Sequence, residues 1–379
     1  MGLVLSEEQR MLSESARELF DEMAPVSALR KLRDEKDPLG YSPELWQQMA
    51  QLGWTGMILP ESVGGSAFGF QGLGIALEQA GRTLAATPML STLVLGATLV
   101  ESLGNPAQRE RLLPAVVEGR CLLALAIDEL PRHRPQLIRT RAERDGDGFA
   151  LSGSKCFVMD GHVADWLLVV ARSAGADEDP TGLSVFLVEP ASAGLSITRT
   201  VMVDSRNAAN LRLDSVRVGA DALLGPAGGA GPALERALDR GRVGLAAEML
   251  GAAQEAFDRT LAYLRMREQF GVPIGAFQAL KHRAALMFAE LELTRSTVYE
   301  ALGALEDERD DAALLSSLAK AQACKCMDLV SSEAIQMHGG IGMTDDEEIG
   351  FFLKRARVAQ QALGDAIFHR DRYARLRGF

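Results

Sequence analysis

The hydrophobic periodicity of this chain changes twice, and these changes limit the possible folds more than any other feature. Over residues 1–118, apolar side chains recur at three- and four-residue steps, as at Leu12, Ala16 and Leu19, which predicts helices. Residues 119–224 carry short runs rich in β-branched and aromatic residues, separated by turn residues, which predicts strands. The glycine-rich segment 225–232 is typical of a linker, and long helical stripes then return.

We therefore predict a mainly α protein with a β-domain in the middle of the chain. The N-terminal helical domain spans residues 1–118, the β-domain 119–224 and the C-terminal helical bundle 225–379. Short connections between the strands favour antiparallel pairing. The predicted strands are 149–151, 156–159, 166–170, 183–188, 195–201 and 211–218.

Composition excludes several classes of function. The basic residues are scattered and the net charge is −11, which argues against nucleic acid as a partner. The sequence has no apolar run long enough to cross a membrane and no signal-peptide layout at its amino terminus, so we expect a cytoplasmic protein. Its four cysteines lack the spacing of zinc ligands, and we expect no metal site.

The common nucleotide-binding motifs are missing as well. No Gly-x-Gly-x-x-Gly follows a predicted strand, and no phosphate loop with Gly-Lys-Ser/Thr occurs. A Rossmann dehydrogenase or a P-loop enzyme is therefore not supported.

The segment YLRMREQFGVPIGAFQALKHRAALM, residues 263–287, is the most informative local motif. A helical pattern stops at Gly271-Val272-Pro273 and restarts, with Arg267, Phe270 and Gln278 around the break. Arg267 has two interpretations: a surface arginine at a helix carboxyl end, or a guanidinium that binds a pyrophosphate beside Phe270.

A second motif is AIQMHGGIGMT, residues 334–344. Gly339 and Gly340 end a predicted helix and leave bare backbone N–H groups within reach of an anion, while Gln336 offers a side-chain amide. The plain alternative is a turn between two helices.

The two motifs together, with LGWTGMILPESVGG (52–65) and GFALSGSKCFVMDGHVADWLLVVAR (148–172), resemble the acyl-CoA dehydrogenase family. The resemblance implies a helical domain, a β-domain and a C-terminal four-helix bundle. It also implies flavin adenine dinucleotide (FAD) at a subunit interface, an acyl-CoA substrate and electron transfer to an electron-transfer flavoprotein. The cofactor-binding residues that it implies are Arg267, Phe270, Gln278, Gln336, Gly339 and Gly340 for a flavin seated mainly in a neighbouring subunit, and Phe157 and Val158 for the flavin ring.

The chain departs from the family at the catalytic base. Relatives carry a glutamate either before a late glycine, where this chain has Leu363, or before an arginine on the first bundle helix, where it has Gly241. Neither side chain can take a proton, so the catalytic residue is unknown, with Asp365 as a weak candidate. Arg242 is a candidate for substrate binding.

Smaller departures concern the flavin ring and the remaining candidate acids and bases. Ile127 and Met159 stand where relatives have threonines that donate hydrogen bonds to the ring. We expect Asp128, Glu129 and Asp160 to be solvated turn acids, and His369 to lie at the surface or in an interface.

Two hypotheses follow from this pattern. In the first, the chain is the non-catalytic subunit of a heteromeric acyl-CoA dehydrogenase, with a paralogous partner that supplies the base. The segment 354–376 resembles the smaller subunits of such pairs, which act on bulky acyl-CoA substrates in fatty acid or steroid catabolism. In the second, it is a self-sufficient homomeric flavoenzyme with a non-standard base such as Asp365. Either assembly would be a dimer or a tetramer.

Overall fold

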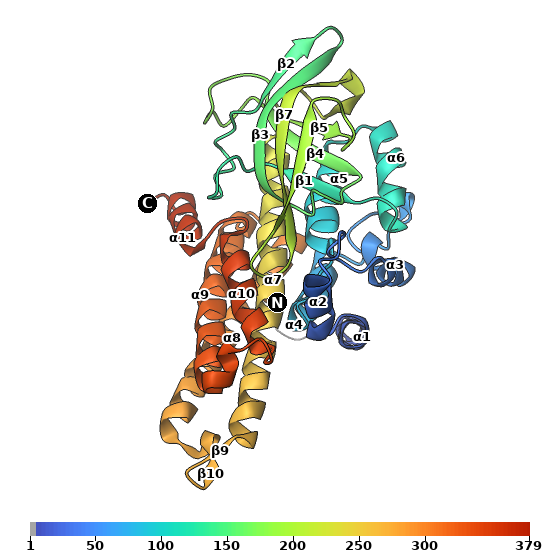
Figure 1. Ribbon diagram of the computed structural model, residues 1–379. Coiled ribbons are helices and arrows are strands. Elements are labelled where there is room, and N and C mark those ends of the chain that lie inside the picture. Colours follow the sequence, from blue (N-terminus) through green and yellow to red (C-terminus); the bar gives the residue numbers. More distant parts are fainter. Residues whose placement is uncertain (1–4) are drawn as a thin grey trace. The chain divides into compact units, whose positions relative to one another are not determined.

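The computed structural model describes residues 5–379, which form two compact units with interleaved sequence (Figure 1). Unit 1 holds the residues up to Lys36 together with Phe70–Ala86 and Arg242–Phe379. Unit 2 holds Asp37–Gly69 and Thr87–Gly241. The boundary between Gly241 and Arg242 falls inside one continuous helix, α7 (Gly231–Met266).

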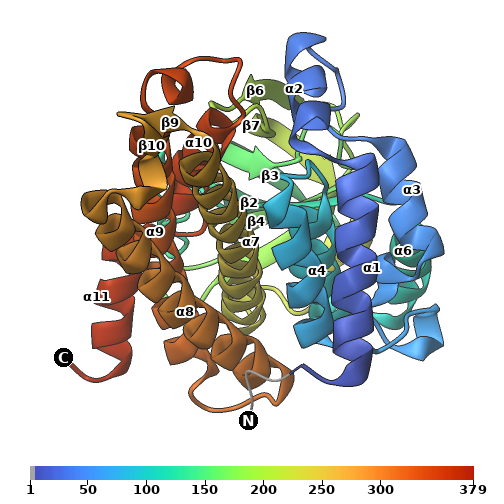
Figure 2. The same ribbon diagram turned by 90° about the horizontal axis from the view of Figure 1, so that it is seen from below.

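Unit 1 is helical. Helix α1 begins at a capping box, in which Ser6 and Gln9 exchange side-chain-to-backbone hydrogen bonds, and it packs beside α4 (Figure 2). Helices α8 and α9 pack along each other, and each buries a stripe of apolar residues, of which the one on α8 was predicted. The helices of this unit besides α7 are α1 (Glu7–Met23), α2 (Val26–Asp34), α4 (Phe70–Arg82), α8 (Gln278–Glu306), α9 (Ala312–His338), α10 (Ile349–Gln361) and α11 (Ala366–Leu376).

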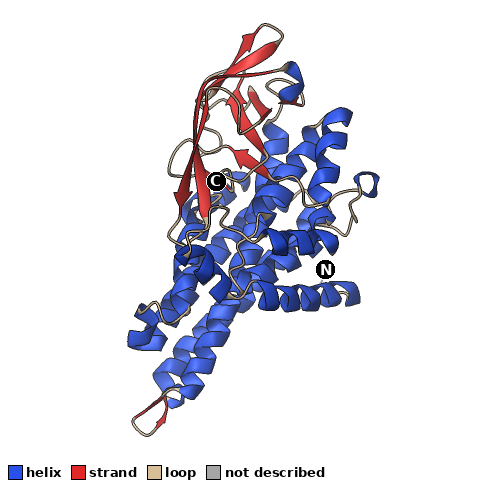
Figure 3. Cartoon of the chain, turned by 45° about the vertical axis from the view of Figure 1, so that its right-hand side comes forward, coloured by secondary structure: helices blue, strands red, loops and turns tan. Residues whose placement is uncertain are grey.

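Unit 2 is built around a β-sheet with strand order β6-β7-β3-β2-β4-β5-β8, to which β1 adds by pairing with β4 (Figure 3). Its strands are β1 (Leu123–Ala126), β2 (Arg141–Asp145), β3 (Gly148–Met159), β4 (Trp166–Arg172), β5 (Leu183–Val188), β6 (Leu195–Val201), β7 (Asn207–Val218) and β8 (Leu223–Leu224). One face buries an apolar cluster in which the rings of Phe149 and Phe186 meet edge to face at 5.0 Å.

Helices complete unit 2, and all nine residues of the π-helix η3 are buried. A π-helix of this length is uncommon, and here Thr92 exchanges hydrogen bonds with the backbone of Leu123 on β1. These helices are α3 (Pro43–Gln51), η3 (Met89–Ala97), α5 (Thr98–Leu103) and α6 (Pro106–Val117).

The predicted strands are found, with three differences. The predicted strands 149–151 and 156–159 are parts of the single strand β3, which is interrupted by a register shift against β7 between Lys155 and Val158. Strands β1 and β2 were not predicted, because Leu-Ala-Leu-Ala has no alternation and Arg-Ala-Glu-Arg-Asp has little apolar character. Pairing is antiparallel except between β1 and β4 and at one position between β2 and β4.

The glycine-rich segment before α7 is tied to the sheet. Gly182 N donates to Gly228 O at 3.0 Å, and Ala230 N donates to Leu183 O at 2.9 Å. No helix within residues 5–379 is long and apolar enough to cross a membrane.

Candidate functional site

The break at Gly271 is a tight β-hairpin that leaves the carboxyl end of α7. Strands β9 (Glu268–Gln269) and β10 (Val272–Pro273) pair with Val272 opposite Gln269, so that Phe270 and Gly271 form the two-residue turn. Both turn residues have positive φ, 56° and 80°, as a type I′ turn requires. Phenylalanine is strained in this conformation, and its ring is 92% exposed. The chain therefore presents an aromatic ring to solvent at the tip of a tight turn.

The polar residues of this motif are also exposed. Arg267 and Gln278 lie at the surface, where Arg267 follows the last turn of α7 and Gln278 begins α8. No carboxylate among residues 5–379 pairs with the Arg267 guanidinium, although the backbone around it is fixed by a 2.8 Å bond from Ile274 N to Arg267 O. An exposed guanidinium beside an exposed ring can bind a phosphate group next to a flat heterocycle.

The second motif lies close to the first. The ring of His338, the last residue of α9, stacks on that of Tyr263 of α7 at 4.4 Å, and its Nδ1 lies 2.7 Å from Ala334 O. Gly339 follows with φ +64° and, with Gly340, is exposed, as is Gln336. A Cβ at Gly340 would meet no atom within 4 Å. The bare backbone at residue 340 is thus open to a group from outside the chain.

The turn at residues 362–365 contains Leu363, the first of the two positions at which the family resemblance places a catalytic base. Leu363 is buried and has φ +57°, and a Cβ on Gly364 would meet the side chains of Phe368 and His369. The Asp365 carboxylate accepts a hydrogen bond from Phe368 N at 2.8 Å and caps α11. The only carboxylate on this turn therefore has a capping role.

The location of His369 differs from the predicted one, which was the surface or an interface. It is fully buried, and its Nε2 lies 3.0 Å from Leu363 O, so it is neither a surface nor a solvent-facing residue of this chain. The sequence suggested exposure because charged residues surround it, but the helix α11 turns this one side chain inward.

The second base position is Gly241, in the interior of α7. Arg242, the candidate substrate residue, is fully buried, and its guanidinium lies over the ring of Phe368 at 5.7 Å from the centroid. A glycine in the middle of a helix has no side chain to offer for proton transfer.

The buried Lys320 donates hydrogen bonds to the segment that ends in the turn at residues 362–365. It was not among the predicted site residues. The Nζ of Lys320 on α9 donates to Gly364 O at 2.9 Å and to Ala359 O at 3.0 Å. Its signal in the sequence was its place on the buried stripe of α9 with Ala323, Met327 and Val330, where an apolar residue is expected.

In unit 2, the candidate flavin-ring residues lie on β3 where its register shifts. Phe157 has φ +51° and is 42% exposed, while Val158 is buried. The amide of Phe157 donates to Asn210 Oδ1 of β7 at 3.1 Å, which fixes the irregular strand. Ile127 is buried and Met159 half-buried, and neither can donate a hydrogen bond.

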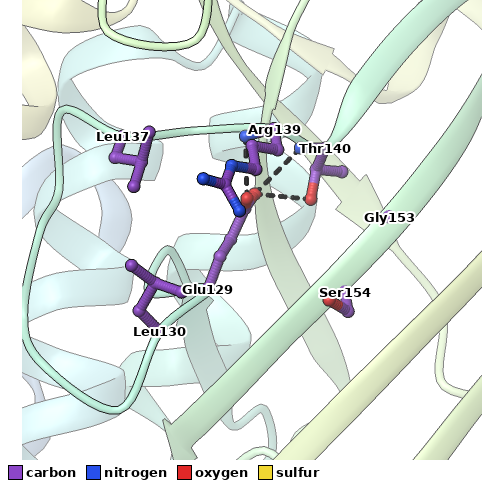
Figure 4. Close-up of a pocket in the computed structure, with 7 residues that line it drawn as sticks. All are labelled: Glu129, Leu130, Leu137, Arg139, Thr140, Gly153 and Ser154. Carbon is purple, nitrogen blue, oxygen red and sulfur yellow. Dashed lines mark hydrogen bonds between the residues drawn. The ribbon is translucent and has the colours of Figure 1, made fainter.

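The loop that follows β1 is organised by Glu129, which contradicts the expectation of a solvated acid. Its carboxylate pairs with the fully buried Lys155 at 2.7 Å. It also accepts hydrogen bonds from Arg139 N, Thr140 N and Thr140 Oγ1 (Figure 4). Burial alone would raise the pKa of Glu129, but the Lys155 charge and these bonds lower it. The small pocket in Figure 4 lies beside this pair.

The other two acids of this region also have partners. Asp160 Oδ2 accepts from the buried Ser91 Oγ at 2.5 Å, and Asp128 lies 2.8 Å from His133 Nδ1. Spacing alone could not show the Ser91–Asp160 contact, because it joins residues 69 apart in sequence, whereas Asp128 and His133 lie in the same loop. No cluster of potential metal ligands occurs within residues 5–379.

Comparison with known proteins relates the whole chain to one family. Three family models match it: the acyl-CoA dehydrogenase N-terminal domain over residues 6–120, the middle domain over 134–216 and the C-terminal domain over 228–376. The acyl-CoA dehydrogenase FadE12 of Mycobacterium tuberculosis is 31% identical over 85% of this chain and 84% of its own length.

Solved structures give the same result. The steroid ACAD Tcur3481-Tcur3483, solved as a variant, is 35% identical, with a TM-score of 0.88 and coverage of 98% of both chains. The ChsE4-ChsE5 complex from Mycobacterium tuberculosis is 26% identical, with a TM-score of 0.90 and coverage of 100% of this chain and 99% of that one.

Proposed function

This chain belongs to the acyl-CoA dehydrogenase family, and from that premise we propose that it is the non-catalytic subunit of a heteromeric, FAD-dependent acyl-CoA dehydrogenase. It completes flavin sites whose base and ring pocket belong to a paralogous partner subunit. The observation that carries this proposal is the turn at residue 363, where a buried leucine stands in place of the glutamate.

The described residues suit the dinucleotide part of FAD. Arg267 and Gln278 are exposed beside the ring of Phe270, and the Tyr263–His338 stack brings the glycine turn with Gln336 near them. The guanidinium offers two parallel donors to a pyrophosphate, and the backbone at Gly339 and Gly340 offers N–H groups. When bound, FAD supplies the hydride acceptor for α,β-dehydrogenation.

The fit to the flavin ring is poorer. Phe157 is exposed enough to lie against a planar ring, with Val158 behind it. Ile127 and Met159 offer no donor to the polar atoms of the ring, and each hydrogen bond left unmade costs about 1–3 kcal/mol if water does not replace it. This chain therefore suits the dinucleotide part of FAD better than the flavin ring, which favours a site shared between unlike subunits.

The remaining expectations form part of the same proposal. The substrate is a bulky acyl-CoA, and a solved relative with the same fold is described as a steroid ACAD. Electrons leave to an electron-transfer flavoprotein, and the chain works in the cytoplasm as part of a dimer or tetramer. The domain boundaries proposed are 118/119 and 224/225.

The test is an absorption spectrum of the chain purified alone, with the native mass of the same sample. We expect little flavin in the lone chain, and about one flavin per shared site after co-expression with a glutamate-bearing paralogue. A full flavin complement in the lone chain, with dehydrogenation of an acyl-CoA, would instead establish the homomeric alternative.

Arg267→Ala tests the shared site directly. We expect the assembled complex to form with its normal mass and to lose its flavin, because the pyrophosphate loses its bidentate partner. Arg265→Ala, which removes an equally exposed arginine from the last turn of α7, is the matched control and should keep it. Normal flavin content in Arg267→Ala would refute the proposal.

A further inference from the structure

Lys320 is a basic group with no carboxylate at ion-pair distance among residues 5–379. It is fully buried, and its Nζ contacts only neutral acceptors: Ala359 O at 3.0 Å, Gly364 O at 2.9 Å, Gln360 O at 3.5 Å and Cys324 Sγ at 3.3 Å. Burial of an ammonium in this way opposes folding. A methionine would fill the same space without that cost. The presence of a lysine therefore indicates a structural role for the N–H donors of its Nζ.

The three carbonyl groups belong to one short segment. Ala359 and Gln360 are in the last turn of α10, whose final carbonyls have no partner inside the helix, and Gly364 lies just beyond. Between them stands Leu363 with φ +57°, a conformation that is unfavourable for any residue with a Cβ. His369 Nε2 contacts Leu363 O at 3.0 Å from the side of α11. The left-handed residue is therefore held between two helices.

We propose that Lys320 is a positioning residue that holds residue 363 in its left-handed conformation and so maintains the turn on which relatives carry their base. The turn's shape then depends on Lys320 and not on the side chain at position 363. A leucine in place of the glutamate removes the proton acceptor but leaves the conformation of the turn unchanged. The inference rests on the proposed function in one respect: it assigns this retained turn to the shared flavin site.

The charged form of the lysine satisfies more of these acceptors than the neutral form does. An ammonium has three N–H donors for these acceptors, whereas a neutral amine has two, so that deprotonation leaves one carbonyl without its bond. Burial lowers the pKa of Lys320, against the opposing effects of Cys324 on α9 and Asp365 at the start of α11, while Arg355 of α10 lowers it further. Alkaline pH should therefore weaken the hold on residue 363.

The experiment compares glycine with alanine at position 363, both in the chain with its native Lys320 and in the Lys320→Met variant. With Lys320 present, Leu363→Gly should have a folding equilibrium constant about tenfold larger than Leu363→Ala, because only alanine is strained by a left-handed φ. With Lys320→Met, residue 363 can leave this conformation. The ratio of the folding equilibrium constants of the glycine and alanine variants should then fall to about one. A ratio that stays near tenfold in the Lys320→Met chain overturns the proposal.

Two controls separate positioning from general stability. Leu84 is another buried leucine of unit 1 with positive φ, 56°, and its glycine-to-alanine ratio should not respond to Lys320→Met. Lys325→Met removes an exposed lysine of the same helix, which pairs with Glu290, and should leave the ratio at residue 363 unchanged. A general loss of stability in Lys320→Met would change the glycine-to-alanine ratios at positions 84 and 363 alike.

A second measurement serves if Lys320→Met does not fold. The same ratio is then measured with Lys320 in place from about pH 5 to about pH 10.5, a range that extends well below the ordinary pKa of lysine because burial lowers the pKa of Lys320. It should fall towards one at position 363 and stay constant at position 84. A constant ratio at both positions overturns the proposal.

The flavin content of the co-expressed complex tests the link to the shared site. Lys320→Met should lower flavin retention several-fold at unchanged native mass. If Arg267→Ala keeps its flavin while the ratio at residue 363 collapses in Lys320→Met, the proposed function fails and the positioning role stands. If Lys320→Met retains flavin fully, the turn does not serve the flavin site.

Discussion

Asp365 stands two residues from the position at which relatives carry their glutamate, and it is the nearest acid to that position in the chain. Its carboxylate already accepts from Phe368 N at 2.8 Å, at the first turn of α11. A carboxylate used in this way orders a helix end, and its removal should be felt mainly in stability. The contacts of Asp365 therefore support a role as a helix cap and not as a catalytic base.

We expect Asp365→Ala to lower the free energy of unfolding by about 1 kcal/mol, because α11 loses its cap. Asp365→Asn should cost only a few tenths of that, since the amide oxygen still accepts from the same N–H. Neither change should alter turnover by the assembled complex. Urea unfolding and steady-state kinetics check this, and a loss of turnover in Asp365→Asn at normal stability would identify Asp365 as the base.

At the scale of elements, the β9–β10 hairpin is organised for contact with something outside the chain. Its tip holds Phe270 with a strained φ and 92% exposure, and the neighbouring Phe277 meets it edge to face at 6.0 Å. An isolated chain gains almost nothing from such a ring, because little apolar surface is buried.

Phe270→Ala should therefore leave the free energy of unfolding of the lone chain unchanged to within about 0.5 kcal/mol. The same change should reduce flavin content in the assembled complex, where the ring becomes covered. Phe379→Ala, which removes another phenylalanine that is 91% exposed, should affect neither quantity. Equal flavin content in the two variants would show that the hairpin tip is not part of the site.

The Lys155–Glu129 pair joins β3 to the loop after β1, and its contribution depends on pH. The pKa of Glu129 is lowered in the folded chain, so its contribution is present above about pH 4.3, the unfolded value, and is lost as pH falls through the folded pKa. Removing the lysine leaves the buried Glu129 carboxylate without a counter-charge, although its hydrogen bonds from Arg139 and Thr140 remain.

We expect Lys155→Met to cost about 3–5 kcal/mol of unfolding free energy near pH 7. The cost should shrink below about pH 4, where Glu129 takes a proton and no longer needs a counter-charge. Lys325→Met, in the more exposed pair with Glu290, should cost less than about 1 kcal/mol. Urea unfolding at the two pH values checks this, and a cost for Lys155→Met that is equal at both would refute it.

At the scale of the whole molecule, helix α8 carries an apolar stripe that the chain does not cover. Leu286 and Leu293, seven residues apart and thus on the same side of the helix, are 63% and 56% exposed. Phe288, nearby, is 55% exposed. Under the proposed assembly, we expect this face of α8 to contact another subunit.

Leu286→Glu with Leu293→Glu should therefore shift the assembly to lower native mass, because two charges would have to be desolvated in the interface. Leu52→Glu, at an exposed leucine of unit 2, is the control and should leave the mass unchanged. Native mass spectrometry of the co-expressed complex gives the answer. An unaltered mass in the double variant would place the interface elsewhere.

Local patterns predicted most of the elements and part of the candidate site. Short apolar and β-branched runs between turn residues identified strands such as β5, and apolar side chains at three- and four-residue steps identified helices such as α8. They failed at β1, whose partner β4 is distant in sequence, and at β2, which has little apolar character although it forms a hairpin with β3. Glycines and an arginine at helix ends identified the exposed motifs around Arg267 and Gly339, since local backbone chemistry determines those turns.

The sequence by itself determined the order of helices and strands, the family, and the absence of a glutamate at positions 363 and 241, since all of these are properties of neighbouring residues along the chain. Only the tertiary structure decided which charged groups are buried: Lys320 on the 359–364 carbonyls, Lys155 on Glu129 and His369 on Leu363. The physical reason is that the burial and hydrogen bonding of these three groups depend on partners up to 44 residues away in sequence, which no local period reports.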